Sequence, residues 1–207
     1  MNIKRTGRLI VFEGIDGTGK STQLPLLAQY LESKGFMVTV TREPTDGAIG
    51  QKIRALYSSR ENTTPEEELQ LFLDDRKEHI EQVVGPALAS GKVVLCDRYY
   101  LSTAAYQGAN GFDPLEIIKR NNFAPKPDIA LIFEQPIETS LERITTSRGE
   151  ALNDFEQADS LKKVSAIFDM LDFPCIRRIQ ANDTIENIHR KVIEAVADSL
   201  EGLPVNS

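Results

Sequence analysis

The segment at residues 12–22 reads FEGIDGTGKST and carries the pattern G-x-x-x-x-G-K-S. An apolar run, LIVF at residues 9–12, precedes it and a helix-like segment follows, which is the context that this pattern requires. Glycines let successive backbone N–H groups converge on phosphate oxygens. A lysine can then neutralise the β- and γ-phosphates, and the serine hydroxyl can ligate Mg²⁺. A glycine-rich turn without a ligand would explain neither the lysine nor the serine. The sequence therefore predicts a nucleoside triphosphate site made by Gly14, Ile15, Asp16, Gly17, Thr18, Gly19, Lys20, Ser21 and Thr22.

A second polar segment, CDRYYLSTAAYQG at residues 96–108, follows another apolar run. A strand that ends in a carboxylate, here Asp97, is typical of a phosphate site, where that group helps to hold hydrated Mg²⁺. Arg98 comes next, at the carboxyl end of the strand, where open α/β sheets bind ligands. If a helix follows, one face carries Tyr99, Ser102, Thr103 and Tyr106. An arginine beside hydroxyls suits a sugar phosphate with its base, while Tyr99 and Ser102 individually also fit a capped, packed helix.

The segment LQLFLDDRKEHI at residues 69–80 places Phe72, Arg76 and His79 on one helix face. A phenylalanine beside an arginine can bind a base, because the ring stacks and the guanidinium donates hydrogen bonds. Core packing would be the default for Phe72 alone, and Arg76 favours a binding site. For His79 we expect a hydrogen bond within the structure instead of catalysis.

The motif T-R-E-P at residues 41–44 follows a further predicted strand. Pro44 fixes a turn at the strand end, where a substrate loop would lie. Arg42 could contact a phosphate, or it could pair with a carboxylate such as Glu43. The sequence does not decide between the two.

The polar segment TTSRGEALNDFEQ at residues 145–157 interrupts two helical patterns and predicts a mobile lid, approximately residues 143–157, or else a plain surface loop. Arg143 and Arg148 are the cations available there. The phosphate-loop motif contains no arginine, so the lid would supply any mobile positive charge to a phosphoryl group in transfer. Asp16 is unusual within an anion site, because its charge opposes the phosphate. We expect it to contact an acceptor hydroxyl or a metal-bound water.

Short apolar runs alternate with helical patterns along the whole chain. The predicted strands are residues 8–13, 36–41, 92–96, 128–133 and 175–179. The predicted helices are residues 20–34, 66–89, 136–146, 156–172 and 184–200. Buried strands separated by helices imply a parallel sheet with right-handed crossovers. With no linker long enough to mark a second domain, residues 1–207 form one α/β domain.

The 207 residues carry a net charge of −7, so the molecule as a whole should repel nucleic acid and anionic membranes. An anionic substrate must then meet arginines and lysines placed locally. Cys96 and Cys175 lie far apart, which argues against a metal site or redox pair, and Cys96 fits a small core residue. The sequence contains no recognisable signal peptide or membrane span, so we expect a cytoplasmic enzyme.

The order of these motifs, with PDIALIF and SRGEALNDFE after them, resembles the thymidylate kinase (dTMP kinase) family across nearly the whole chain. Any P-loop kinase shares the first motif, whereas its combination with TREP, F-x-x-D-R and DRY…S-x-x-A-Y-Q-G is specific. The resemblance implies the P-loop NTPase fold with a five-stranded parallel sheet in three α/β/α layers, and a homodimer. It also implies Mg²⁺-dependent transfer of the γ-phosphate of ATP to dTMP, giving dTDP for dTTP biosynthesis.

The resemblance also implies roles for individual residues. Phe72 would stack on thymine and Arg76 would bind its edge, while Thr103 or Gln107 would face the base and sugar. Arg98 would hold the acceptor phosphate, helped by Arg42 in the loop of Pro44. Asp16 would meet the 3′-hydroxyl, and Tyr106 would crowd the 2′ position and favour deoxyribose. Lys20, Arg98 and Arg148 would be catalytic, with Arg143 on the ATP side. Metal ligands would be Ser21 and, through water, Asp97, with Asp16 and Glu156 as further candidates.

The lid departs from the family pattern D-R-F-E, because it reads Asn153–Asp154–Phe155–Glu156. The motifs leave three alternatives. The first is another nucleotide or nucleoside kinase on the same fold; of these, a deoxynucleoside kinase would need a carboxylate base, whereas this acceptor region carries three arginines, which favours a monophosphate acceptor. A GTP-binding switch would need an N-K-x-D segment, which the chain lacks. A non-catalytic nucleotide-binding homologue is suggested only by the altered lid.

The lid arginine leads to a first prediction. Arg148→Ala should lower kcat by at least about tenfold while leaving dTMP affinity nearly unchanged, because a mobile cation would act only in the transition state. Steady-state kinetics test this, and an unaltered kcat would exclude Arg148 as the lid cation.

Overall fold

The computed structural model describes residues 6–57, 63–148 and 158–205, and the side chains of residues 147 and 148 are not among those described. Five strands form one sheet in the order β2-β3-β1-β4-β5, and every neighbouring pair is parallel. The strands are β1 (Arg8–Glu13), β2 (Val38–Arg42), β3 (Val93–Asp97), β4 (Ile129–Glu134) and β5 (Ile176–Gln180). The prediction of a five-stranded parallel sheet is confirmed, with strand bounds within two residues of those expected.

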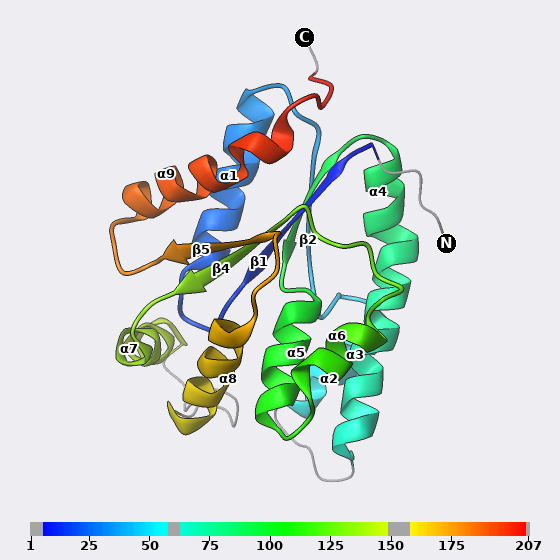
Figure 1. Cartoon of the computed structure of the whole chain (residues 1–207), viewed down its shortest axis with the longest axis vertical. Coiled ribbons are helices and arrows are strands. Elements are labelled where there is room, and N and C mark those ends of the chain that lie inside the picture. The colour runs from blue at the N-terminus through cyan, green and yellow to red at the C-terminus, as the bar shows by residue number, and fades with distance from the viewer. Residues whose placement is uncertain (1–5, 58–62, 149–157, 206–207) are drawn as a thin grey trace.

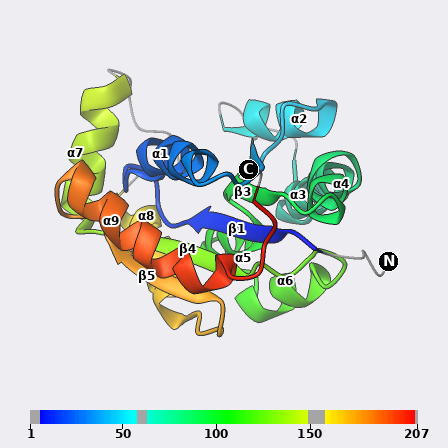
Figure 2. The same ribbon diagram turned by 90° about the horizontal axis from the view of Figure 1, so that it is seen from above.

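Helices cover both faces of this sheet (Figures 1 and 2). They are α1 (Lys20–Ser33), α2 (Ala48–Leu56), α3 (Pro65–His79), the π-helix η1 (Ile80–Val84), α4 (Gly85–Ala89), α5 (Tyr100–Ala109), α6 (Pro114–Arg120), α7 (Ile137–Arg148), α8 (Ala158–Met170), α9 (Ile185–Val196) and the 3₁₀ turn η2 (Ala197–Leu200). Residues of α1 and α9 form the core against one face. Residues of η1, α4, α5 and α8 form the core against the other face. The three-layer α/β/α arrangement is therefore confirmed.

The central strand β1 explains why the apolar run at residues 9–12 is continuous. Successive side chains of a strand point to opposite faces. Ile10 and Phe12 pack into the α1–α9 core, whereas Leu9 and Val11 pack into the core on the other face. All four are fully buried. Because both faces are covered by helices, no position in this run can be polar without cost.

Two features of the helices differ from the sequence prediction. Residues 66–89 are not one helix, because α3 passes into η1 and then into α4, which has Pro86 in its first turn. A proline has no N–H to donate and clashes with the preceding turn, which interrupts the regular hydrogen-bond pattern just before Pro86. The helix α2 was not predicted, because its nine residues are short and only two of them are buried, Gly50 and Ile53.

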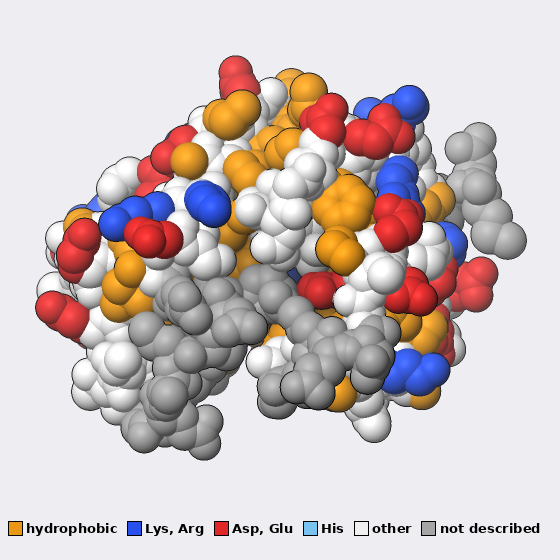
Figure 3. Space-filling model, turned by 90° about the horizontal axis from the view of Figure 1, so that it is seen from below, with side chains coloured by type: hydrophobic (Ala, Val, Ile, Leu, Met, Phe, Trp, Pro, Cys, Tyr) orange, Lys and Arg blue, Asp and Glu red, His pale blue; other side chains and the backbone are white. Residues whose placement is uncertain are grey.

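Acidic and basic side chains of the described residues are interspersed on the face drawn in Figure 3. Across the described ranges, no helix combines the length and the apolar character needed to cross a membrane.

The N-terminus of α3 leads to a stability prediction. The Thr64 hydroxyl accepts a hydrogen bond from the backbone N–H of Glu67, and the Glu67 carboxylate accepts one from the N–H of Thr64. This reciprocal cap satisfies two N–H groups that the helix cannot. Thr64→Ala should therefore lower the free energy of unfolding by ~1 kcal/mol in urea denaturation. The neighbouring Thr63→Ala variant is the control and should change it by less than ~0.5 kcal/mol; equal losses would contradict the cap.

Candidate active site

The phosphate loop at residues 14–19 joins β1 to α1 and depends on glycines at close approaches. Gly14 has a φ of 121°, and a Cβ there would lie 2.6 Å from the carbonyl oxygen of Phe133. Gly17 has a φ of 80°, and a Cβ there would lie 2.5 Å from the carbonyl oxygen of Ser140. Both positions therefore exclude any side chain, and the loop is packed against the end of β4 and the start of α7.

Lys20 is buried at the first turn of α1 and lies against its own loop. Its Nζ donates to the carbonyl oxygens of Gly14 (3.0 Å) and Ile15 (2.7 Å). Burial, followed by the nearby charge of Arg98, lowers the pKa of Lys20 to about 8. The Thr18 hydroxyl also donates to Ile15, so it stabilises the loop from within. A phosphate at the loop would offer Lys20 an anionic partner in place of neutral carbonyls.

Arg98 occupies a backbone conformation that non-glycine residues rarely adopt, with a φ of 67°. Its N–H donates to the carbonyl oxygen of Phe12 at 2.9 Å, so this conformation is held by β1. The guanidinium donates through Nη2 to Asp16 Oδ1 (2.7 Å) and through Nη1 to Ser102 Oγ (3.1 Å). It also lies over the ring of Tyr106, 5.0 Å from the centroid. Burial alone would lower the pKa of Arg98, but Asp16 raises it well above its usual value, so the cation is permanent. Backbone strain of this kind is characteristic of functional sites.

A hollow of about 300 Å³, which we call the α3–α5 hollow, lies beside Arg98. Its wall contains all nine residues predicted to bind a substrate: Asp16, Arg42, Pro44, Phe72, Arg76, Arg98, Thr103, Tyr106 and Gln107. The predicted helix face is also confirmed, since Tyr99 and Ser102 line the same hollow. Sequence reasoning missed Arg54 and Tyr57, which reach this wall from α2 and the residue after it. The signal for them would have been the amphipathic pattern of α2.

Arg76 is almost fully buried, with 1% of its side chain exposed. Its Nε and Nη2 donate to Glu43 Oε2 at 2.9 and 2.6 Å. Its Nη1 donates to Asn121 Oδ1 (2.6 Å), and Nη2 also donates to Thr103 Oγ1 (3.0 Å). The guanidinium is thus held rigidly in the wall of the hollow that also contains Phe72. Phe72 and Arg76 are therefore brought together in one wall, as predicted.

The expected alternative that Arg42 pairs with a carboxylate is confirmed, but the carboxylate is Asp46 and not the suggested Glu43. Alternating strand geometry points Arg42 to the surface, where it pairs with Asp46, and Glu43 to the interior. Arg54 also pairs with Asp46 and donates to the carbonyl oxygen of Pro44 at 2.9 Å.

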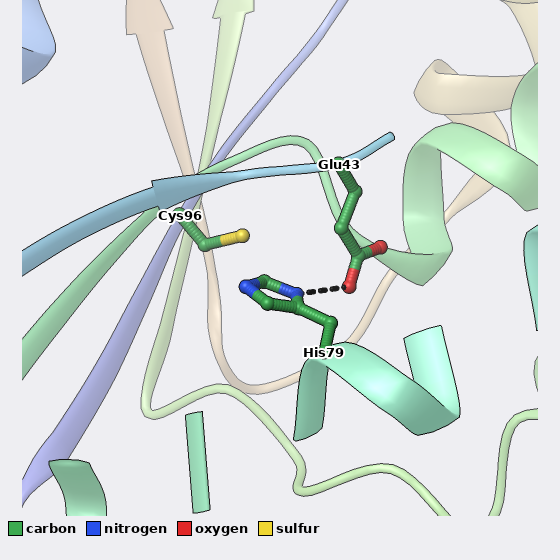
Figure 4. A group of neighbouring side chains, drawn as sticks. All are labelled: Glu43, His79 and Cys96. Atoms are coloured by element: carbon green, nitrogen blue, oxygen red, sulfur yellow. Dashed lines mark hydrogen bonds and ion pairs between the residues drawn. The ribbon is translucent and has the colours of Figure 1, made fainter. Parts of the chain in front are cut away.

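Glu43, His79 and Cys96 lie close enough together to suggest a metal site (Figure 4). Each of them already has another role. Glu43 binds both Arg76 and His79 Nδ1 (2.9 Å), and His79 Nε2 lies 2.7 Å from the hydroxyl of Thr41. Burial raises the pKa of the Cys96 thiol well above its usual range, and the thiol donates to the Arg98 carbonyl oxygen. Glu43 and His79 are therefore a hydrogen-bonded support for Arg76, Cys96 bonds to the backbone of Arg98, and the expectation for His79 is confirmed.

Gln107 offers the α3–α5 hollow an acceptor. Its Nε2 donates to Glu68 Oε1 at 3.0 Å, which fixes the orientation of the amide. Its Oε1 is buried and has no hydrogen-bond partner in the described part of the chain. An unsatisfied buried acceptor is costly, so a ligand N–H at this point would be bound favourably.

A second hollow of about 570 Å³, which we call the loop hollow, lies on the other side of the phosphate loop. It is lined by predicted residues, namely Asp16, Gly17, Gly19, Lys20, Ser21, Thr22 and Arg143. Sequence reasoning missed Asp183, Ile185 and Ile188, which reach the hollow from the loop after β5 and from α9. No recognisable motif marks them, because they meet the phosphate loop only through the fold.

Arg143 is connected to the phosphate loop by Gln135, which the sequence did not single out. Gln135 Oε1 accepts from Arg143 Nη1 at 2.8 Å. Its Nε2 donates to the Gly17 carbonyl oxygen (3.0 Å) and to Ser140 Oγ (2.7 Å). One amide therefore joins α7, the end of β4 and the phosphate loop.

Ser21 and Asp97 fit the predicted magnesium site. Both line the loop hollow, and their oxygen donors are of the type that Mg²⁺ prefers. Asp97 Oδ1 is buried and has no hydrogen-bond partner within the described ranges, which leaves it available to a hydrated cation. Asp16 is already engaged by Arg98 and Tyr106. Glu156, Asn153, Asp154 and most of the predicted lid lie outside the described residues, as does the side chain of Arg148 at the end of α7.

The two hollows share three wall residues, Asp16, Asp97 and Arg98. A triphosphate bound on the loop and an anion bound beside Arg98 would therefore face each other across this boundary. A parallel α/β sheet with a phosphate loop and a second anion site at the carboxyl end of its strands defines the class of P-loop phosphotransferases.

The comparisons with known proteins specify this class further. The thymidylate kinase family model matches residues 12–192, so the chain belongs to the thymidylate kinase family. The thymidylate kinase of Desulfotalea psychrophila is 57% identical over 195 residues, which cover 94% of this chain and 96% of that protein. The probable thymidylate kinase of Pyrococcus horikoshii is 42% identical over 205 residues, covering 95% and 99%. The thymidylate kinase of Xanthomonas euvesicatoria is 39% identical over 206 residues, covering 98% and 90%.

Gln135 leads to a prediction for the ATP side. Gln135→Ala removes the acceptor of Arg143 and a donor to the phosphate loop, a loss of ~1 kcal/mol of binding. The KM for ATP should therefore rise roughly fivefold, and the KM for dTMP should stay within twofold. Gln180→Ala, which removes an amide bonded to Glu134 instead, is the matched control and should leave both constants unchanged. A higher KM for dTMP alone would contradict the assignment of Gln135 to the ATP side.

Proposed function

We propose that this chain transfers the γ-phosphate of ATP to dTMP, giving dTDP and ADP, with the loop hollow holding ATP and the α3–α5 hollow holding dTMP. The observation that carries this assignment is the shared wall of Asp16, Asp97 and Arg98. A reaction between two phosphates needs two anion sites that open onto one another, and the shared wall supports this arrangement.

The chemical step needs positioning and charge stabilisation more than proton transfer. An oxygen of the dTMP phosphate forms a bond to the γ-phosphorus as the bond from that phosphorus to the β-phosphate oxygen of ADP breaks. The attacking oxygen is already ionised, so no general base is required. Lys20 would bind the β- and γ-phosphates, and Arg98 would hold the acceptor phosphate. The rigid backbone of Arg98 lowers the entropy that must be lost when the two phosphates align.

Ser21 and, through water, Asp97 would hold Mg²⁺, which when bound neutralises charge on the phosphates. Arg148 would add positive charge from the lid end of α7, and Arg143 would contact ATP from the wall of the loop hollow.

Recognition of dTMP follows from the wall of the α3–α5 hollow. Phe72 would stack on thymine, while Arg76 and Gln107 would bind its polar edge, with Thr103 beside them. Arg76 offers a donor and Gln107 offers an unsatisfied acceptor, which suits a base that presents both a carbonyl and an N–H. Asp16 would exchange part of its contact with Arg98 for the 3′-hydroxyl. Tyr106, fixed between Arg98 and Asp16, would leave no room for a 2′-hydroxyl.

The resemblance supports a homodimer, and exposed apolar side chains at Leu115 and Phe123 around α6 offer a surface for it. Free thiols at Cys96 and Cys175 suit a reducing compartment such as the cytoplasm.

The test is an assay of ADP release with ATP and Mg²⁺ that compares dTMP, dUMP, the ribose form of TMP and thymidine. We expect strong turnover with dTMP and at least about tenfold less with the ribose form, because Tyr106 is fixed. Thymidine should be inactive, because Arg98 has no phosphate to hold. Tyr106→Ala should narrow the difference between the two sugars. Equal turnover of thymidine and dTMP would refute the monophosphate acceptor, and failure of all four would leave a nucleotide-binding protein without this activity.

A further inference from the structure

Glu13 is a buried acidic residue to which neither the sequence motifs nor the proposed reaction gives a role. It is the last residue of β1, and none of its surface is exposed. Its Oε2 accepts a hydrogen bond from the Ser102 hydroxyl. Its Oε1 has no hydrogen-bond partner among the residues that the structure describes. Burial of a carboxyl group with one unsatisfied oxygen lowers stability, so packing does not explain why this position is acidic.

The partner of Glu13 connects it to the acceptor site. Ser102 Oγ accepts a hydrogen bond from Arg98 Nη1 at 3.1 Å. The hydroxyl has a single proton, and the Ser102–Glu13 contact uses it. Hydrogen bonds therefore run in one direction, from the Arg98 guanidinium to Ser102 and from Ser102 to Glu13. A carboxylate at the end of such a chain strengthens each bond in it.

Arg98 is thus held from two sides that differ in their access to substrate. Asp16 and Tyr106 bind Nη2 from the wall of the α3–α5 hollow. Glu13 lies behind the wall, where no substrate atom can compete with it. When a phosphate takes the place of Asp16 on Arg98, the bonds from Nη1 remain to orient the guanidinium, one to the Gly14 carbonyl oxygen (3.2 Å) and one to Ser102 Oγ. Of these two acceptors, only Ser102 passes the interaction on to a carboxylate.

We propose that Glu13 is a positioning residue for the acceptor phosphate, and that it acts through Ser102 to hold Arg98 at the boundary between the two hollows. This inference rests on the proposed function, because it assigns Arg98 to the phosphate of dTMP. Glu13 itself touches neither substrate.

The surroundings of Glu13 raise its pKa, so its charge changes with pH near neutrality. Burial raises its pKa to about 7, while Ser102, Arg98 and Arg76 oppose the rise and Glu43 adds to it. Tyr100 from α5 and Cys175 from the segment before β5 also lie within its electrostatic reach. Glu13 is therefore protonated in the folded protein at pH 6 and ionised at pH 8. In the unfolded chain it ionises near its ordinary value of 4.5, so the stability that it contributes falls as pH rises from 4.5 to about 7 and then stays level.

The experiment compares Glu13→Gln with the wild-type protein in kcat/KM for dTMP between pH 6 and pH 8.5. Glutamine is isosteric with the protonated acid, so the two proteins should be similar at pH 6. At pH 8 the wild-type protein should be about tenfold better, since it alone presents an ionised acceptor to Ser102. Both proteins use the same substrate, so the ratio of their kcat/KM values is unaffected by the titration of the dTMP phosphate. The KM for ATP should be unchanged.

Thermal unfolding separates this role from a structural one. The Tm of Glu13→Gln relative to wild type should rise from pH 5 to pH 7, so the variant loses activity while gaining relative stability. Ser102→Ala, which breaks the chain and keeps the acid, should lower kcat/KM by a similar factor at pH 8. The double variant should be no worse than either single variant. Ser102→Ala also provides the test if Glu13→Gln fails to fold.

Glu134→Gln is the matched control, because Glu134 also ends a strand at this edge of the sheet but pairs with Arg178. It should keep the kinetics of the wild type at both pH values. A ratio of wild type to Glu13→Gln that stays within twofold from pH 6 to pH 8.5 would overturn the inference while the proposed function stands. If the wild-type protein does not phosphorylate dTMP at all, the proposed function fails and the inference fails with it.

Discussion

The parallel pairing of β1 with β3 is the interaction on which the site depends. It sets Phe12 opposite Asp97, so the phosphate loop and the Asp97–Arg98 segment leave the sheet side by side. The hydrogen bond from the Arg98 N–H to Phe12 then continues the ladder by one residue and holds Arg98 in its left-handed conformation. A slip of one residue in this register would turn the side chains of β1 to the opposite faces. Both hollows would then lose their shared wall.

Electrostatics explain how an acidic protein can bind two highly charged anions. The net charge of −7 would repel them at a distance, but the cations at the site are concentrated and fixed. Each arginine in the wall of the α3–α5 hollow pairs with a carboxylate: Arg98 with Asp16, Arg76 with Glu43, and both Arg42 and Arg54 with Asp46. These ion pairs orient the arginines in the absence of substrate. Pairs that a ligand can reach, such as Arg98 with Asp16, can exchange partners, whereas the buried pair of Arg76 and Glu43 is permanent.

The site also shows where stability is given up for function. Arg98 has a strained backbone, Lys20 is a buried cation, and Glu13, Asp97 and Gln107 each contain a buried oxygen without a hydrogen bond within the described ranges. Each feature of this kind lowers stability, and together they surround the two hollows: Glu13, Lys20, Asp97 and Arg98 near the carboxyl ends of β1 and β3, and Gln107 on α5. The two apolar cores on either side of the sheet compensate for them. The stability of the two cores therefore allows the site to keep a strained backbone and buried polar groups.

Much of this protein is determined by local sequence. The phosphate loop, the five strands and the residues on one face of α5 follow from glycine spacing, apolar runs and helical periodicity, which act over a few residues. Tertiary structure alone decided the rest. It placed Glu43 on Arg76 rather than on Arg42, brought Gln135 to Gly17, and set Asp183 and Ile185 beside the phosphate loop. These contacts join segments about 30 to 170 residues apart, and no local pattern can specify which distant partner a buried polar group will meet. The role proposed for Glu13 is also decided by tertiary structure, because Glu13 meets the Ser102 hydroxyl only when α5 packs against the end of β1.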